Sequence, residues 1–380
     1  MKYRKFGSLD WNVSALGFGC MRLPTADGVP GSGNIDEAEA IRMIRHAIDQ
    51  GVNYVDTAYP YHGMNSEIVT GKALRDGYRD KVKLATKCPV WLINSPDDFD
   101  KYLDEQLSKL QTDHIDFYLL HALGRDRWNN MVLKHDLLNK AEAAKKAGKI
   151  KHLGFSFHDE PGAFKEIVDG YDKWEFCQIQ YNFMDTENQA GVDGLKYAAS
   201  KGLAVVIMEP LLGGKLANPP KSILELYSSF AKKRSAADWA LQWIWNQPEV
   251  SVVLSGMSNM DQVRENLRSA DDSGINTLCP DEVELVEGVR KKYKERLAIP
   301  CTGCNYCMPC PNGVDIPSNF ELYNNGFVHE NMEASRFTYS KFFKAEEKAD
   351  VCIQCRVCET KCPQKISISE WMPKVHLALK

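Results

Sequence analysis

The chain has 380 residues, 44% of them hydrophobic and 26% charged, which is the composition of an ordinary folded protein and excludes a disordered or fibrous chain. Its formal net charge of -4 comes from interspersed acidic and basic residues, so we expect no nucleic-acid partner, since a basic stripe is what recruits phosphates. No apolar run is long enough for a membrane span or a secretory signal, and we therefore expect a cytoplasmic protein without membrane contact.

The first segment, residues 2–16, predicts a short hairpin whose turn contains Gly7 and Ser8, placed to plug the floor of a barrel. After it, short apolar runs alternate with amphipathic helical stretches up to about residue 271, a pattern typical of parallel strands joined by crossover helices. The eight runs lie near residues 14–19, 53–58, 82–87, 114–121, 151–156, 176–182, 203–210 and 250–256. Because eight parallel strands close a barrel, the expected fold is α/β, a (β/α)8 TIM barrel.

The composition changes after Asp271. A turn-rich stretch leads into an amphipathic helix and then to Pro300, and eight cysteines fall within the last 80 residues. We expect a barrel over residues 1–275, a linker and helix over 276–299, and a small, mostly α-helical ferredoxin-like domain over 300–380.

Three ionisable residues end neighbouring strands of the expected barrel, namely Asp56, Lys87 and His121. Residues at the carboxyl ends of barrel strands meet at one mouth, and Tyr61 lies in the loop that leaves the second strand. For any one charged residue a solvated strand end is an equally good interpretation, and for Tyr61 alone packing on its neighbours is the simpler one. Three such residues on adjacent strands indicate a shared pocket.

The four residue types in this pocket suit the reduction of a carbonyl to an alcohol, or the reverse. Hydride that reaches a carbonyl carbon builds negative charge on oxygen, which requires a proton donor in positive surroundings. We expect Tyr61 to be the general acid or base, with its pKa lowered by the Lys87 ammonium. Asp56 would keep Lys87 charged and in place, and His121 would orient the substrate oxygen through a hydrogen bond.

Three strings around these residues resemble the catalytic motifs of the aldo-keto reductase family: VDTAYPYHGMNSE, KLATKCP and IDFYLLHA. They occur in the same order and barrel context, and the resemblance covers roughly the first 270 residues. It implies that Asp56, Tyr61, Lys87 and His121 form the family's catalytic tetrad. It also implies that NADP or NAD binds extended across the barrel mouth, without a Gly-rich Rossmann turn.

The same resemblance nominates residues of the later strands for cofactor binding. These are Ser156, Gln178, Met208, Gly256, Ser258, Gln262, Glu265 and Asn266. Simpler interpretations stay open, namely a strand-end cap for Ser156, a buried amide for Gln178 and a solvated helix start for the last group. Met208 replaces an aromatic residue that usually stacks on the nicotinamide. Apart from Arg264, no basic side chain is evident for a 2′-phosphate, so NADP and NAD both remain possible.

The cysteines form two runs, CTGCNYCMPCP and CIQCRVCETKCP, and the second has the spacing of a bacterial ferredoxin motif. Two [4Fe-4S] clusters are therefore predicted, with a pair of zinc sites as the alternative. If the ligation is crossed, as in two-cluster ferredoxins, the ligands are Cys301, Cys304, Cys307 and Cys362 for one cluster and Cys310, Cys352, Cys355 and Cys358 for the other.

Two functions remain open. The tetrad predicts an NAD(P)H-dependent oxidoreductase that acts on a small-molecule aldehyde, ketone or sugar. The clusters allow an electron-transfer protein that exchanges single electrons with a ferredoxin-like redox partner, although a nicotinamide gives two electrons as hydride and each cluster takes one. A third possibility is that the clusters only stabilise the small domain.

Overall fold

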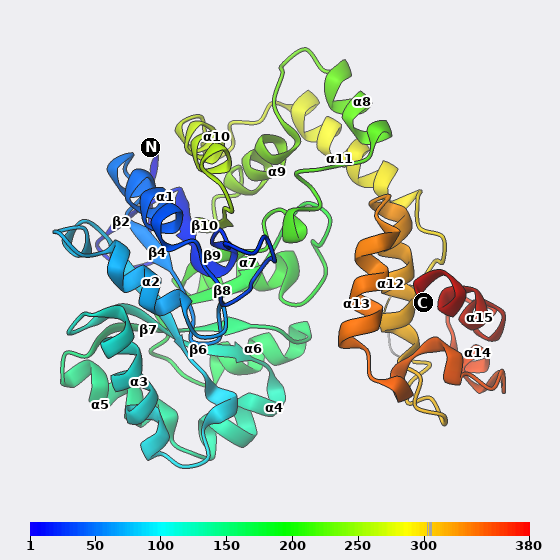
Figure 1. Ribbon diagram of the computed structural model, residues 1–380, viewed down its shortest axis with the longest axis horizontal. Helices are drawn as coiled ribbons and strands as arrows, with labels where there is room; N and C mark the ends of the chain where they lie inside the picture. Colours follow the sequence, from blue (N-terminus) through cyan, green and yellow to red (C-terminus); the bar gives the residue numbers. More distant parts are fainter. Residues whose placement is uncertain (302, 304–305) are drawn as a thin grey trace. The chain divides into compact units, whose positions relative to one another are not determined.

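The computed structural model spans residues 1–380 and describes all of them except 302, 304 and 305. It divides into two compact units (Figure 1). The first unit comprises residues 1–217 and 234–283, and the second comprises residues 218–233 and 284–380. Within the described residues, no helix is both long and apolar enough to cross a membrane.

The first unit is a closed barrel of eight parallel strands, which confirms the fold expected from the sequence. Neighbours around the barrel follow the order β10-β3-β4-β5-β6-β7-β8-β9, so the last strand pairs with the first. The strands are β3 (Leu16–Gly19), β4 (Tyr54–Asp56), β5 (Lys83–Cys88), β6 (Ile115–Leu123), β7 (Ile150–Phe157), β8 (Phe176–Gln180), β9 (Ala204–Met208) and β10 (Val250–Gly256).

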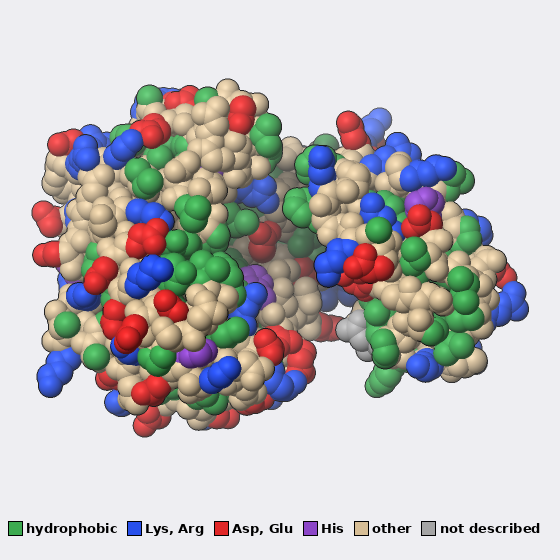
Figure 2. Space-filling model, turned by 60° about the horizontal axis from the view of Figure 1, so that its bottom comes forward, with side chains coloured by type: hydrophobic (Ala, Val, Ile, Leu, Met, Phe, Trp, Pro, Cys, Tyr) green, Lys and Arg blue, Asp and Glu red, His purple; other side chains and the backbone are tan. Residues whose placement is uncertain are grey.

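Helices follow the strands and lie around the barrel (Figure 1). In the first of them, Met43, Ile44 and Ala47 are fully buried, and Asp36 caps the helix by accepting a hydrogen bond from the Glu39 N–H group. The helices are α1 (Glu37–Asp49), α2 (Ser66–Ala73), α3 (Asp97–Leu110), α5 (Leu137–Lys146), α6 (Pro161–Asp169), α7 (Gly191–Ser200), α9 (Ala236–Trp245) and α10 (Met260–Asp271). Figure 2 shows acidic and basic side chains intermingled on the visible face of this unit.

The N-terminal hairpin closes the floor of the barrel. Its strands β1 (Tyr3–Lys5) and β2 (Asn12–Ser14) pair in antiparallel fashion, and Phe6 between them is fully buried. The Phe6 ring packs on Tyr54, Phe117 and Phe176, with centroid separations of 5.9, 4.7 and 5.9 Å. Since Tyr54 and Phe176 are the first residues of their strands, the hairpin fills the amino-terminal end and the mouth lies at the opposite end.

The second unit is mostly helical, as expected. Its core is a cluster of buried apolar side chains that includes Phe320, Tyr339, Ile368 and Met372. The helices are α8 (Lys221–Ser229), the main part of α11 (Pro280–Lys294), α12 (Ile316–Val328), α13 (Met332–Phe342), α14 (Val357–Lys361) and α15 (Ile368–Leu379). Helix α8 comes from within the residue range that the sequence suggested for the barrel, so the second unit is built from two separate stretches of chain.

Candidate active site and iron-sulfur sites

Three of the four predicted catalytic side chains meet directly at the barrel mouth. Asp56 is the last residue of β4, and Lys87 lies near the end of β5. The Lys87 Nζ atom lies 2.6 Å from Asp56 Oδ1, 2.8 Å from the Thr57 carbonyl oxygen and 3.4 Å from the Tyr61 hydroxyl. Lys87 and Asp56 are almost completely buried, so this is an ion pair and hydrogen-bond network shielded from bulk water.

His121 lies beside Tyr61, on β6. The two rings approach edge to face, with their centroids 6.2 Å apart. The His121 Nδ1 atom is buried and makes no hydrogen bond to any residue that the structure describes. A buried polar atom of this kind is typical of a position where a ligand atom completes the hydrogen bonding.

The pKa values of these groups reflect competition between burial and neighbouring charges. For Lys87, burial opposes the charged form, but Asp56 and Tyr61 outweigh it and raise the pKa of the ammonium above its ordinary value. For Tyr61, burial raises the pKa, and the favourable effect of Lys87 on the phenolate is not large enough to reverse this. Lys87 thus acts to lower the pKa of Tyr61, as expected from the sequence, but burial raises this pKa by more, so the expected net lowering is wrong. Tyr61 is therefore a protonated phenol at neutral pH.

His121 is held neutral. Burial lowers the pKa of His121 well below its ordinary value, and the charges of Lys87, His158 and Arg127 act in the same direction. A neutral imidazole offers one N–H donor and one acceptor, which suits an orienting role better than it suits a general acid.

The first group of predicted cofactor residues lies on the next strands around the same mouth. Ser156 and Gln178 occupy paired positions on β7 and β8 and are both 1% exposed. The Gln178 side-chain amide donates to Asp56 Oδ2 at 3.3 Å, and the Ser156 hydroxyl accepts from the Ala122 N–H group at 2.7 Å. Met208 ends β9 and is partly exposed. Both polar side chains are thus tied to the tetrad region, and the Ser156 hydroxyl proton remains available to a ligand.

The second predicted group forms a separate cluster at the end of β10 and the start of α10. Gly256 ends the strand, and Ser258 donates its backbone N–H to the Gln262 side chain at 2.8 Å and its hydroxyl to the Arg22 carbonyl at 2.9 Å. Glu265 is partly exposed on α10. Asn266 is buried and donates to the Ser255 hydroxyl at 2.9 Å, so its amide already has a structural partner.

A hydrogen-bond network that supports the site was not found from the sequence. Glu67 is fully buried, and its Oε1 accepts from the Thr86 hydroxyl at 2.7 Å and from the Gln106 amide at 2.5 Å, while Gln106 also donates to the Lys87 carbonyl at 3.0 Å. This network supports the strand that carries Lys87. The sequence signals for it were that Glu67 falls in the first of the three family-like strings and Thr86 in the second.

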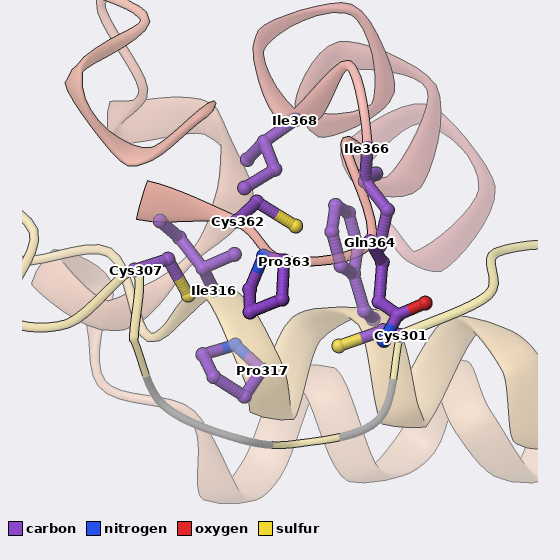
Figure 3. A pocket seen from close by; sticks show the side chains of 10 residues that line it. Cys301, Cys307, Ile316, Pro317, Cys362, Pro363, Gln364, Ile366 and Ile368 are labelled. Atoms are coloured by element: carbon purple, nitrogen blue, oxygen red, sulfur yellow. The ribbon is translucent and has the colours of Figure 1, made fainter. Parts of the chain in front are cut away.

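In the second unit, three of the predicted ligands line one cavity. Figure 3 shows the sulfur atoms of Cys301, Cys307 and Cys362 pointing into the same space, which is otherwise walled by Ile316, Pro317 and their apolar neighbours. These three cysteines belong to the set predicted for the first cluster, and the fourth, Cys304, lies outside the described residues. A cavity lined by thiols and apolar groups suits a cluster bound by thiolates.

The other four cysteines lie nearby. Cys310, Cys352 and Cys358 pack against or belong to the same apolar core as the first set, while Cys355 is exposed. Burial raises the pKa of Cys358 to about 11, an effect to which the neighbouring Cys352 and Cys307 contribute. These thiols lie close together, yet no disulfide forms among the described cysteines. Binding to a metal suits such a group, because the thiols lose their protons and bind as thiolates.

The fold and these sites define an oxidoreductase barrel joined to an iron-sulfur module, and comparison with known proteins identifies both parts. The family model for the aldo/keto reductase family matches residues 15–288, and the model for a 4Fe-4S dicluster domain matches residues 300–367. The chain belongs to the aldo/keto reductase family, and it is an NAD(P)-dependent oxidoreductase with two [4Fe-4S] clusters. The iron-sulfur interpretation of the cysteine runs is thereby confirmed over zinc.

Individual relatives match the barrel. The "Uncharacterized oxidoreductase YqkF" of Bacillus subtilis is 28% identical over 77% of this chain and 97% of its own length. The L-galactose dehydrogenase of Arabidopsis thaliana is 28% identical over 76% and 93%. Among solved structures, aldo-keto reductase AKR11C1 from Bacillus halodurans, in its holo form, has a TM-score of 0.63 at 27% identity and covers 76% of this chain and 96% of its own.

Proposed function

We propose that this protein reduces a small-molecule aldehyde, ketone or sugar to the alcohol, or runs the reverse reaction, with Tyr61 as the general acid or base. The observation that carries the proposal is the position of Lys87 Nζ, which lies 2.6 Å from Asp56 and 3.4 Å from the Tyr61 hydroxyl, next to the neutral ring of His121. This arrangement supplies a proton donor, a fixed positive charge and an orienting hydrogen bond around one point.

The chemistry follows from these groups. A bound nicotinamide dinucleotide supplies hydride to the carbonyl carbon, or accepts it in the reverse direction. His121 orients the carbonyl oxygen through a hydrogen bond, and Tyr61 gives that oxygen its hydroxyl proton as negative charge develops. Lys87 stabilises the tyrosinate that remains, and Asp56 holds Lys87 charged. In the reverse direction the tyrosinate takes the alcohol proton.

The cofactor residues support an extended dinucleotide at the mouth. We assign Ser156, Gln178 and Met208 to the nicotinamide end, because they border the tetrad, and Gly256, Ser258, Gln262, Glu265 and Asn266 to the adenosine end. Arg264 is exposed and already faces Asp261 at 3.5 Å. Arg22 forms no ion pair with any described residue, and its side chain lies against Gly256, so we assign Arg22 to the cofactor phosphates. NADPH and NADH are both compatible with this assignment. One solved aldo-keto reductase, from Klebsiella pneumoniae, is a complex with NADPH. It is 22% identical, with a TM-score of 0.62, and the match covers 76% of this chain and 95% of its own.

The test is a pair of tyrosine variants. Tyr61→Phe removes the proposed acid, and kcat for aldehyde reduction should fall about 10²- to 10⁴-fold, as expected for the loss of general acid catalysis. Tyr59→Phe is the matched control, since the Tyr59 hydroxyl contacts Glu105 at 3.2 Å rather than the tetrad. Turnover is followed through nicotinamide absorbance with a panel of aldehydes, ketones and alcohols. Equal activity of Tyr61→Phe and the wild type would rule out the assignment.

A second candidate function, transfer of single electrons to a partner protein, is supported by the surface around the second cysteine run. Cys355 is exposed, and so are its neighbours Ile353 at 68% and Val357 at 45%. Arg356 and Lys361 are also exposed and form no ion pair within the described part of the chain. An apolar, basic rim around a cluster favours docking of an acidic one-electron carrier such as a ferredoxin.

This second function is tested by one-electron chemistry. Chemically reduced protein gives one electron from a [4Fe-4S] cluster to one oxidised ferredoxin, and the rate should fall with rising salt and in Arg356→Glu. A rate that is insensitive to both changes counts against docking at this surface. Anaerobic addition of NAD(P)H, with visible absorbance as the readout, shows separately whether electrons pass from the barrel to the clusters.

We place the protein in the reducing cytoplasm, because none of the described cysteines forms a disulfide.

A further inference from the structure

Two side chains that the proposed mechanism does not use lie near the tetrad, one beside His121 and the other beside the first. Trp91 belongs to η3 (Val90–Leu92), the turn after β5, and its ring centroid lies 5.0 Å from that of His121. Arg127 ends α4 (Arg125–Arg127), a single turn after β6, and its Cζ atom lies 5.4 Å from the Trp91 ring centroid. Both turns follow the carboxyl ends of their strands and therefore lie at the mouth of the barrel. There the Trp91 ring contacts both the Arg127 guanidinium and the His121 ring.

Arg127 differs from its neighbour Arg125 in having no carboxylate partner. Arg125 pairs with Glu160 at 2.6 Å and with Glu166 at 2.9 Å. Arg127 is partly exposed and forms no ion pair with any residue that the structure describes. Its Nη1 atom donates to the Ala122 carbonyl oxygen at 2.6 Å. A guanidinium has five N–H donors in a planar fork, so one hydrogen bond leaves most of them available.

The charge of Arg127 already acts on the reaction site. After burial it is the main cause of the lowered pKa of His158, and it also contributes, after burial, Lys87 and His158, to the lowered pKa of His121. The other cation of the site, Lys87, is neutralised by Asp56 at 2.6 Å. Arg127 is thus a cation near the site without a carboxylate partner among the described residues, and an anion is the species that would balance its charge.

We propose that Arg127 binds an anionic group of the substrate, so that the enzyme acts on small carbonyl compounds that carry a carboxylate or phosphate a few bonds from the carbonyl carbon. This inference rests on the proposed carbonyl reduction and adds the class of substrate. The planar guanidinium can donate two parallel hydrogen bonds to an oxoanion, and the Trp91 ring offers an apolar wall for the intervening carbon chain.

The kinetic test compares substrates matched in length. Succinic semialdehyde is paired with butanal, and glyceraldehyde 3-phosphate with glyceraldehyde, so that a carboxylate and a phosphate are tested separately. In the wild type, kcat/KM for the preferred anion should exceed that of its neutral partner about 10- to 100-fold, the usual effect of hydrogen bonds to a charged group. Arg127→Met should abolish this preference mainly through KM, Arg127→Lys should keep part of it, and the control Arg125→Met should leave it unchanged.

Two kinetic outcomes would overturn the inference. One is an anion preference that survives in Arg127→Met. The other is an equal loss of activity on anionic and neutral substrates, which would mean that Arg127 only holds the Ala122 peptide next to His121. Ala122 has a left-handed backbone (φ 54°), a conformation that a neighbouring hydrogen bond can help to hold. Activity on the neutral substrates measures this structural role, because they carry no anionic group.

A binding measurement separates this inference from the proposed reaction. Succinate, which cannot be reduced, is titrated against the intact cofactor-loaded protein with tryptophan fluorescence as the readout, and succinamide serves as the neutral control. Saturable quenching by succinate that is lost in Arg127→Met supports the anion site even if no aldehyde is turned over. Equal responses to succinate and succinamide, or an unchanged response in Arg127→Met, would exclude it.

Discussion

Burial and a neighbouring ammonium shift the pKa of the phenol at position 61 in opposite directions. Burial raises the pKa of Tyr61, and Lys87 at 3.4 Å favours its ionised form. The net result is a phenol that keeps its proton at neutral pH, which suits the reductive direction, in which that proton is given away. The residue types alone indicated the influence of Lys87, but the extent of burial depends on the folded mouth.

The pH dependence of the two directions should follow from this protonation state. Since the pKa of Tyr61 lies above its ordinary value near 10, kcat/KM for carbonyl reduction should stay level through neutral pH and fall only in the strongly alkaline range. Alcohol oxidation needs the tyrosinate and should rise over the same alkaline range. Both profiles are measured at saturating cofactor. A break in the reductive profile below pH 8 would contradict the assignment of Tyr61 as the acid.

A second prediction at this scale concerns Lys87. Lys87→Met removes the only cation within reach of the Tyr61 hydroxyl among the described residues and leaves the buried Asp56 carboxylate without its ion-pair partner. We expect kcat to fall about 10²-fold or more. We also expect the alkaline limb of alcohol oxidation to move to still higher pH, because nothing then favours the tyrosinate. An alkaline limb that stays at the same pH as in the wild type would show that Lys87 does not act through Tyr61.

Strand β6 shows how one element can carry stability at one end and chemistry at the other. At its start, Asp116 is buried and accepts from the Leu84 N–H group at 3.0 Å and from Arg79 at 2.7 Å. Near its end is His121. Burial alone would raise the pKa of Asp116, but Arg79, Leu84 and Lys83 outweigh it and lower the pKa to about 2.

The low pKa of Asp116 makes part of the barrel's stability depend on pH. Because the folded pKa lies below the unfolded value of about 3.9, the carboxylate stabilises the fold by about 2 kcal/mol above pH 4, and this contribution is lost as the pH falls toward 2. Asp116→Asn should therefore lower the free energy of unfolding at pH 7 by about that amount, and the gap to the wild type should narrow below pH 4. Urea unfolding followed by circular dichroism measures it. The exposed Asp113→Asn is the control, and an equal effect of both variants would contradict the prediction.

At the scale of elements, the sequence predicted the strands and turns that a local or periodic residue pattern marks. All eight barrel strands and the hairpin were found, because apolar runs and turn residues mark them directly. The placement of helix α8 in the second unit could not be found, since nothing in its sequence says which core it joins. Burial of a loop side chain is equally hard to predict: the His62 ring is buried, contacting the Ser32 carbonyl oxygen at 2.8 Å and accepting from the Leu23 N–H group at 3.1 Å. Trp91 and Arg127 were missed because only the folded loops bring them to His121.

At the scale of the molecule, the clusters and the core of the second unit depend on each other. Five cysteines, Cys301, Cys307, Cys310, Cys352 and Cys362, pack against its apolar core. Removing iron should therefore unfold this unit at a lower temperature while the barrel, whose core is separate, remains folded. Calorimetry with and without an iron chelator under reducing conditions should show one transition shifted and the other unchanged. A shift of both transitions would contradict this independence.

A variant of the exposed Cys355, a predicted cluster ligand, tests what the clusters contribute to activity. Cys355→Ser should disturb the second cluster, which is visible in the absorbance and the iron content. If carbonyl reduction is undiminished, the clusters stabilise the unit or serve a separate electron-transfer step. If carbonyl reduction falls while the barrel transition is unchanged, the clusters take part in turnover.

The pairing of β3 with β10 also has a consequence for how the protein is made. During synthesis the edge of β3 leaves the ribosome early, and its partner β10 follows only after most of the barrel has been translated. Until then an apolar strand edge is open to other nascent chains, a hazard that favours protection by a chaperone. The eight cysteines of the two runs are translated after β10, so these iron sites can form only once all eight barrel strands have been translated.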